Sequence, residues 1–512
     1  MITACDGSSS GAPSPGGSSS SAPAAGAASA SSGGPAPAAA PLHWNACSGD
    51  LSGMQCASLA VPLNYADPAG RKISIALSMV PATAPKAQQQ GIMLVNPGGP
   101  GGSGRSLAAT IASTLDPSVA SQYTIVGFDP RGVGGSQPEL SCDPTFFDSV
   151  RPDYDPASAA QEQDLVSRAK SYAAGCEKQF GWMLPYMTTA DAARDMDSIR
   201  AAFDVSKITY YAFSYGTYLG QVYATLFPAR VRRMVLDSTV DPAGVWYQDN
   251  IEQDYAFEGR IDAFFAWAAR NDSTYRLGAT RAAVASQYAR ARSMLAAHPV
   301  SVSGSPQIGP DELDDTYVQA GYANWLWADL ASALSQYVTS GGSSTSSLAS
   351  AYESDGTQPE NEFAVYNAVQ CSDVNWPRSW AKWDADTETV DRTAPFYAWG
   401  NTWFNAACAF WPVTGPATPM KIGAPGLPGI LMLQGTLDAA TPYAGAQNAH
   451  KALPTAKMVV VQGGGNHGQS LQEPSDSCVM GYLNSYLATG ALPGGTGPVD
   501  ATCPTPPDPS AG

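Results

Sequence analysis

Short apolar runs recur along most of the chain, and longer segments with helical spacing of apolar residues separate several of them. The runs cover residues 72–80, 91–95, 123–128, 208–213, 231–236, 429–433 and 457–461. Most are continuous rather than alternating, as expected of parallel strands that are covered on both faces. Ala190 to Phe203 is one of the helical segments, with aspartates and arginines on its polar face. Strands that alternate with helices predict an α/β fold with a mostly parallel sheet.

The alternation stops after Asp241-Pro242, and strand patterns resume at Gly429. The stretch between them is helical and aromatic, and 10 of the 12 tryptophans lie in it. A segment of this size between the sixth and seventh core strands predicts an inserted helical cap. Its aromatic side chains more often form its own core than line a cleft, so we expect few of them to touch a ligand. We therefore divide the folded chain into a first core part, 42–242, a cap, 243–416, and a second core part, 417–512.

Residues 1–41 differ from the rest in composition. Residues 7–41 consist of Ser, Gly, Ala and Pro without any charged residue, and such a run behaves as a flexible tether because it cannot build a core. Ile2-Thr-Ala-Cys5 resembles a bacterial lipobox, in which the cysteine carries a lipid after a signal peptide is cleaved. The sequence predicts lipidation of Cys5, and an incidental cysteine near the start is the alternative.

Charge narrows the class of partner. The chain has 512 residues and a formal net charge of −17, which argues against nucleic acid and against an anionic membrane surface as partners. It contains no run of about 18 apolar residues that could span a bilayer, so contact with a membrane is expected only through a lipid on Cys5. We expect a monomer without a metal ion or other cofactor.

The cysteines indicate an oxidising compartment. Eight of the nine cysteines remain when Cys5 is set aside, and an even number fits a disulfide framework. None forms a CxxC pair, so a zinc ribbon or redox motif is not expected. The spacing favours sequential pairing, although eight cysteines allow many connectivities. The predicted bridges are Cys47–Cys56, Cys142–Cys176, Cys371–Cys408 and Cys478–Cys503, and we expect the protein outside the cytoplasm or at the cell envelope.

A serine lies where the apolar run 208–213 meets a helical segment. Ala212-Phe-Ser214-Tyr-Gly216 matches the small-x-Ser-x-Gly pattern of a nucleophile elbow, with alanine in place of the first glycine. The turn is so tight that it needs small residues two before and two after the serine, and alanine still meets that demand. A strand before the match and a helix after it make the motif much more specific. Ser214 is therefore the predicted nucleophile.

A serine hydroxyl needs a neighbouring base, and the chain offers only four histidines. In this arrangement the order along the chain is Ser, acid, His, which removes His43. His298 lies within the helical insertion and His450 within a helical segment, whereas His467 lies in a glycine-rich loop after the strand run 457–461. His467 is the predicted base. Asp438, after the run 429–433, is the predicted acid, and Thr441 is either a hydrogen-bond donor to that carboxylate or a helix cap.

Acyl transfer also needs hydrogen-bond donors for the oxyanion. The backbone N–H of Tyr215 follows the nucleophile and is one candidate. The second is Gly99 in the loop Asn96-Pro-Gly-Gly-Pro-Gly-Gly-Ser-Gly104, because Pro100 has no N–H. This loop matches neither the phosphate-binding P-loop pattern, since no lysine follows, nor the dinucleotide-binding pattern.

Several motifs together resemble the secreted tripeptidyl aminopeptidases of actinobacteria, which belong to the proline iminopeptidase-like serine peptidases. The resemblance extends over about residues 43–505 and implies an α/β-hydrolase fold. It also implies an exopeptidase that removes short peptides, often tripeptides, from free N-termini. The motifs are the loop 96–104, Asp129-Pro-Arg-Gly-Val-Gly-Gly-Ser136, the Ser214 elbow, Val235-Leu-Asp-Ser238, Asp438 with His467, the N-terminal segment from Trp44 to Tyr65, and the segment from Cys478 to Cys503.

The resemblance further implies acidic groups that receive the α-ammonium of the peptide substrate. Such an anchor would reject blocked or internal peptide bonds. Asp373 is the first candidate and Glu252 the second, and for each the alternative is a helix cap or an ion pair with arginine. A carboxylesterase with the same triad is the alternative function, since a fold does not determine a substrate.

Overall fold

The computed structural model describes residues 42–148, 151–301, 307–472, 475–495, 497 and 499–511. The predicted tether and Cys5 lie outside the described residues, so the lipidation site stays a prediction. Among the described residues, no helix combines the length and the hydropathy that crossing a bilayer requires.

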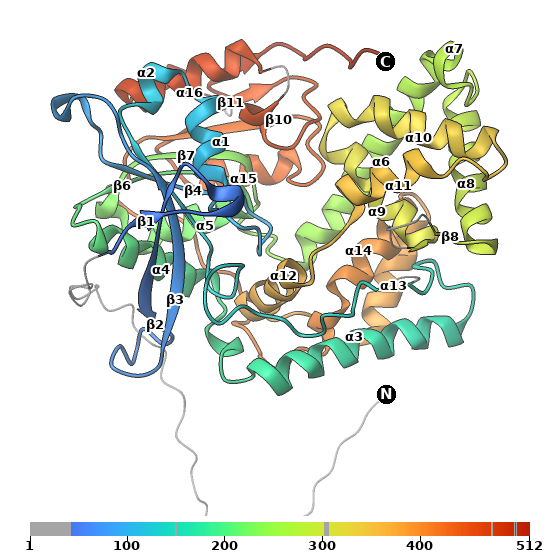
Figure 1. Ribbon diagram of the computed structural model, residues 1–512, viewed down its shortest axis with the longest axis horizontal. Coiled ribbons are helices and arrows are strands. Elements are labelled where there is room, and N and C mark those ends of the chain that lie inside the picture. Colours follow the sequence, from blue (N-terminus) through green and yellow to red (C-terminus); the bar gives the residue numbers. More distant parts are fainter. Residues whose placement is uncertain are drawn as a thin grey trace, which may run out of the picture. The chain divides into compact units, whose positions relative to one another are not determined.

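The described chain contains a ten-stranded sheet with the order β1-β2-β3-β5-β4-β6-β7-β10-β11-β12, which lies to one side of the inserted helices (Figure 1). The pairs from β5 to β12 are parallel, whereas β1, β2 and β3 pair antiparallel. The mostly parallel α/β fold is thus confirmed. The strands are β1 (Asn45–Ala46), β2 (Gln55–Pro62), β3 (Lys72–Val80), β4 (Ile92–Asn96), β5 (Thr124–Phe128), β6 (Ile208–Ser214), β7 (Val231–Thr239), β10 (Ile430–Gly435), β11 (Ala456–Val461) and β12 (Ala501–Cys503).

The seven predicted apolar runs correspond to β3, β4, β5, β6, β7, β10 and β11. The sequence did not predict β1, β2 and β12. β2 lies next to the two-residue edge strand β1, and its first four residues have no buried side chain. A continuous apolar run, the signal used for the other strands, is therefore missing there.

Helices cover both faces of the sheet. Ile92 and Leu94 of β4 belong to one buried cluster, whereas Met93 of the same strand belongs to another, because successive side chains of a strand point to opposite faces. The first cluster includes side chains of α4, α5 and α15, and the second includes side chains of α1 and α16. These flanking helices are α1 (Leu107–Thr114), α2 (Pro117–Ala120), α4 (Thr189–Ala202), α5 (Tyr215–Leu226), α15 (Tyr443–Ala452) and α16 (Ser477–Thr489).

The segment between β7 and β10 is mainly helical, as the sequence predicts, and it also holds the short pair β8 (Val300–Ser301) and β9 (Gln307–Ile308). β7 and β10 are the seventh and eighth strands of the main sheet in chain order, so the predicted place between the sixth and seventh strands is corrected by one strand. Side chains of α6 to α11 form a core of their own around Phe264 and Trp267. Phe363 and Trp376, from α12 and the loop after it, instead join the main core against the sheet. Only part of the insertion therefore has a separate core. Its helices are α6 (Tyr247–Arg270), α7 (Asp272–Tyr275), α8 (Arg281–Ala297), α9 (Pro310–Tyr322), α10 (Trp327–Thr339), α11 (Ser346–Ala351), α12 (Glu360–Asp373), α13 (Trp380–Asp391) and α14 (Ala398–Asn405).

Helix α3 (Ala159–Phe180) precedes β6 in the sequence but packs against the inserted helices (Figure 1). Leu165 and Val166 of α3 share a buried cluster with Trp403 of α14. Just before α3, the Arg151 guanidinium pairs with Glu312 of α9 at 3.0 Å. The first core part, 42–242, thus contributes a segment to the cap side of the molecule. The sequence boundary at residue 242 does not reveal this contribution.

The four predicted disulfides are all present: Cys47–Cys56, Cys142–Cys176, Cys371–Cys408 and Cys478–Cys503. Cys371–Cys408 joins the end of α12 to the short helix η7 (Ala406–Ala409). Each bridge connects two cysteines that follow one another in the order of the eight, as the spacing favours.

Candidate active site

Ser214 lies at the sharp turn between β6 and α5. Its φ of 55° and ψ of −133° are in a region that residues other than glycine rarely adopt. A Cβ on Gly216 would lie 2.6 Å from Asn96 Oδ1 and 3.0 Å from the Ala212 Cβ. Glycine is therefore required after the serine, whereas the methyl group of Ala212 is accommodated before it. This backbone geometry is that of a nucleophile elbow.

The structure brings Asp438 and His467 together. His467 Nδ1 lies 3.0 Å from Asp438 Oδ1 and 3.1 Å from Oδ2. Thr441 donates to the same carboxylate through its hydroxyl at 3.0 Å and its backbone N–H at 3.1 Å. Because the carboxylate accepts a hydrogen bond from the Nδ1–H group, Nε2 is left as the basic nitrogen of the ring. His467 Nε2 is buried and has no hydrogen-bond partner among the described residues.

Two opposing effects set the pKa of His467. Burial by itself would lower this pKa, but the charge of Asp438 and its hydrogen bond outweigh burial, and the charge of Asp237 adds to them. The net pKa is raised above the ordinary value of a histidine. The ring is thus poised to accept a proton at Nε2, and Asp438 stabilises the imidazolium that results.

The two predicted oxyanion donors line the same cavity as Ser214 and His467. Tyr215 is the first residue of α5, so its N–H has no acceptor within the helix. Gly98, just before Gly99, is pressed against the elbow, because a Cβ there would lie 2.8 Å from the Ser214 Cβ. The Gly98 N–H is bonded to Asn96 Oδ1 at 3.0 Å, whereas Gly99 lines the cavity, so the Gly99 N–H stays the candidate donor of this loop.

The cavity has a volume of about 730 Å³ and lies between the carboxyl ends of the strands and the inserted helices. Its polar lining is strongly acidic, since five carboxylates and no lysine or arginine line it among the described residues. The acids are Asp241, Asp249, Glu252, Asp315 and Glu362. A cavity of this kind favours a cationic ligand.

The two predicted amine anchors lie in different places. Glu252 lines the cavity, where it accepts a hydrogen bond from Gln248 at 2.9 Å. The Asp373 carboxylate is not part of the lining. It accepts bonds from the Thr189 N–H at 2.7 Å, the Thr189 hydroxyl at 2.5 Å and the Trp246 indole at 3.3 Å. Asp373 thus ties the end of α12 to the start of α4, and both of its oxygens already accept hydrogen bonds.

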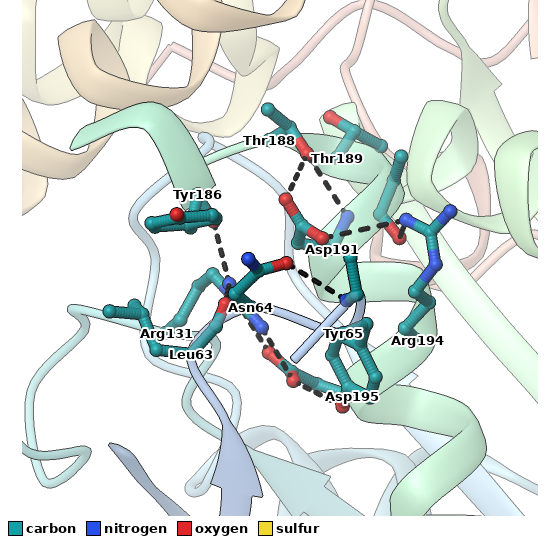
Figure 2. Close-up of polar contacts among 12 residues, drawn as sticks. Leu63, Asn64, Tyr65, Arg131, Tyr186, Thr188, Thr189, Asp191, Arg194 and Asp195 are labelled. Carbon is teal, nitrogen blue, oxygen red and sulfur yellow. Dashed lines mark hydrogen bonds and ion pairs between the residues drawn. The ribbon is translucent and has the colours of Figure 1, made fainter. Parts of the chain in front are cut away.

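A buried ion pair holds the middle of α4 (Figure 2). Arg131, from the Asp129-Pro-Arg motif, forms two hydrogen bonds of 2.8 Å to Asp195 of α4. The guanidinium also donates to the backbone oxygens of Leu63 and Tyr186. Although burial opposes its charge, Asp195 raises the pKa of Arg131. This motif therefore connects the N-terminal segment, the loop after β5 and α4, and it does not enter the cavity.

The sequence did not single out Asp237, although it lies in the Val235-Leu-Asp-Ser motif at the end of β7. Its carboxylate is fully buried and accepts the backbone N–H groups of Gln469 and Ser470 at 2.8 and 2.9 Å. Burial raises the pKa of Asp237 to about 6. Asp237 thus holds the loop that carries His467 against the sheet, and the position of an acid at a strand end was the available signal.

Comparisons with known proteins agree with this geometry. The model of the alpha/beta hydrolase fold family matches residues 91–473. The tripeptidyl aminopeptidase of Streptomyces coelicolor is 40% identical over 479 residues, which cover 91% of this chain and 86% of that protein. The serine protease Hip1 of Mycobacterium tuberculosis is 31% identical, with 88% and 90% covered, and carboxylesterase B of the same organism is 30% identical, with 90% of each covered.

A match over three quarters of the chain, together with relatives that align along nearly their whole length, defines the family. The predicted resemblance is confirmed. The chain belongs to the α/β-hydrolase family and, within it, to the group that includes the Streptomyces tripeptidyl aminopeptidases.

Proposed function

We propose that this protein is a serine aminopeptidase that removes short peptides, about three residues long, from free N-termini. The observation that carries the proposal is that Ser214, His467 and an excess of carboxylates line one cavity. Its volume of about 730 Å³ lies within the roughly 300–1,000 Å³ typical of sites for drug-sized ligands. A tripeptide is of that size, and its α-ammonium supplies the cation that the acidic lining favours.

In the proposed reaction, Ser214 Oγ attacks the scissile carbonyl carbon while His467 Nε2 takes the hydroxyl proton. The backbone N–H groups of Gly99 and Tyr215 stabilise the negative oxygen of the tetrahedral intermediate. The carbon–nitrogen bond then breaks, and His467 returns the proton to the leaving amine. Water, activated by the same nitrogen, hydrolyses the acyl-enzyme and frees the short peptide and Ser214.

Labelling with a fluorophosphonate tests the nucleophile. We expect wild-type protein to be labelled and Ser214→Ala to be unlabelled, with Ser103→Ala as the matched control for loss of a serine near the cavity. Labelling of Ser214→Ala at the wild-type rate would refute the assignment.

A panel of mono-, di- and tripeptidyl amides with free and acetylated N-termini tests the exopeptidase activity. We expect free tripeptidyl amides to be cleaved best, and Glu252→Gln to reduce the preference for the free amine over the acetylated one. Equal kcat/KM for free and acetylated peptides would contradict an amine anchor.

Carboxylesterase activity is the second candidate, and the relative named carboxylesterase B supports it. Short acyl esters in the same panel distinguish the two functions, because an esterase would cleave them while leaving every peptidyl amide intact. The four disulfides support a location outside the cytoplasm. Lipidation of Cys5 would hold the protein at the cell envelope, and mass spectrometry of the N-terminal peptide tests it.

A further inference from the structure

The cavity carries more negative charge than a single ammonium group balances. Of its five carboxylates, Asp315 pairs with the Arg151 guanidinium at 2.7 Å. For the other four, no ion pair to a described lysine or arginine is present. Two of these four, Asp249 and Glu362, are largely withdrawn from solvent, since burial raises the pKa of both carboxyls, and a carboxylate in such a place is costly unless a ligand supplies a cation. Because the α-ammonium of the proposed substrate carries one charge, the lining suggests a second cation.

The four carboxylates lie on two walls. Asp241, Asp249 and Glu252 come from the segment between β7 and the first turns of α6, here called the α6 wall. Asp249 Oδ2 is shut off from solvent and has no hydrogen-bond partner among the described residues. Burial, followed by the charges of Asp241 and Glu252, raises the pKa of Asp249 well above its ordinary value. The α6 wall is therefore prepared for one cation, and the proposed function assigns the α-ammonium to it.

Glu362 forms the other wall, in the first turn of α12. Its backbone touches the oxyanion loop, since a Cβ on Gly101 would lie 2.4 Å from the Glu362 carbonyl oxygen. Gly98, three residues earlier in that loop, packs against the Ser214 Cβ. Three residues span at most about 11 Å between their Cα atoms. Glu362 thus borders the loop whose Gly99 N–H is proposed to bind the oxyanion, and it lines the same cavity as Gly99 and Ser214.

The carboxylate of Glu362 has no structural task within the described chain. Glu360, in the same helical turn, accepts bonds from the Cys142 and Asp143 N–H groups and the Tyr172 hydroxyl, at 2.8, 3.0 and 2.8 Å. Glu362 has no such bond to a described residue, and burial raises its pKa. The helix dipole favours an acid in this turn by only about 0.3–1 kcal/mol, which does not explain why the acid faces a cavity.

We propose that Glu362 is a second cation subsite, which binds the lysine or arginine side chain of the substrate residue that supplies the scissile carbonyl. This inference rests on the proposed aminopeptidase function and names the class of peptide it prefers: one with a positive charge at its N-terminus and another beside the cut. The geometry that carries it is the separation of the lining carboxylates into the α6 wall and Glu362, together with the contact between Glu362 and the oxyanion loop.

Tripeptidyl amides of a fluorogenic amine test the subsite, because only the acyl part of the substrate then varies. The matched pairs are Ala-Ala-Arg against Ala-Ala-citrulline and Ala-Ala-Lys against Ala-Ala-(ε-acetyl-Lys), all with free N-termini. In each pair the side chains are similar in shape and differ in charge. In wild-type protein we expect kcat/KM to be at least about tenfold higher for the charged member, the effect typical of a charge-assisted hydrogen bond.

Variants at Glu362 assign the effect to this wall. We expect Glu362→Gln to bring the charged-to-neutral ratio near one and Glu362→Lys to bring it below one. Glu388→Gln, an exposed acid of α13 outside the cavity, controls for the change in net charge and should retain the wild-type ratio. Fluorophosphonate labelling of each variant verifies that its active site is folded.

The outcomes separate this inference from the proposed function. Cleavage of the neutral peptides with a wild-type ratio near one refutes the subsite and leaves the aminopeptidase intact. A ratio that survives in Glu362→Gln but disappears in Asp249→Asn also refutes it, because the α6 wall would then bind the side chain. Failure to cleave any peptidyl amide, with esters cleaved, refutes the proposed function itself.

Discussion

Variants of Asp373 test whether this carboxylate stabilises the fold, as its contacts indicate, or binds the substrate amine, as the sequence predicts. As an acceptor for Thr189 and Trp246, it should stabilise the fold and leave amine recognition unaffected. In Asp373→Ala the Thr189 N–H and the Trp246 indole lose their acceptor, whereas the Thr189 hydroxyl keeps the Tyr215 hydroxyl at 2.8 Å. Two orphaned donors at about 1–3 kcal/mol each predict a loss of about 2–6 kcal/mol in the free energy of unfolding.

Asp373→Asn should cost less, because its amide oxygen can still accept from the Thr189 N–H and its amide group can donate to the Thr189 hydroxyl, so that only the Trp246 indole loses its acceptor. Urea denaturation followed by tryptophan fluorescence measures both variants, and the ratio of kcat/KM for free and acetylated tripeptidyl amides measures amine recognition. We expect that ratio to be unchanged in Asp373→Asn. If it fell toward one while stability stayed at the wild-type level, Asp373 would be the amine anchor and the structural reasoning would be wrong.

The pH dependence of stability provides an independent check on Asp373. Burial raises the pKa of this carboxyl to about 7 in the folded protein, above the value of about 3.9 in an unfolded chain. A group with a raised folded-state pKa contributes stability that is full below the unfolded value and is lost as the pH rises through the folded one. Asp373→Asn should therefore be more stable relative to wild type at pH 8 than at pH 4, and equal differences at the two pH values would contradict this.

Three further predictions concern the catalytic centre. Asp438→Asn removes the main cause of the raised pKa of His467, so kcat should fall by about 10⁴-fold. The acidic limb of the pH profile of kcat/KM should also move to lower pH, and an unmoved limb would count against the pairing of Asp438 with His467. Thr441 is not the cap of α15, whose N-cap residue is Pro442. Thr441→Val removes the hydroxyl that donates to Asp438 and should lower kcat by about tenfold with little change in KM, whereas unchanged kinetics would mean that this hydroxyl does not assist Asp438. Gly98→Ala places a methyl group 2.8 Å from the Ser214 Cβ, so fluorophosphonate labelling should be lost, and normal labelling would show that the elbow can shift.

Much of the site was predictable because it depends on local sequence. A strained turn between a strand and a helix demands small residues at fixed spacing around Ser214, and this demand is visible in the sequence. The strand-end positions of Asp438 and His467 follow from the same alternation of strands and helices, since the carboxyl ends of parallel strands meet at one edge of the sheet. Proline at position 100 and the neighbouring glycines similarly restrict which N–H group can serve the oxyanion.

The sequence by itself determined the α/β alternation, the helical insertion, the order of Ser214, Asp438 and His467, and the sequential disulfides, because each leaves a pattern among residues close together in the chain. Only the tertiary structure decided the roles of the acids. Asp373 and Glu362 lie at opposite ends of one helix and look alike in the sequence, yet Asp373 is used by Thr189 and Trp246 whereas Glu362 lines the cavity. The partners that distinguish them come from distant segments, and a carboxylate's role depends on which donors the fold brings to it.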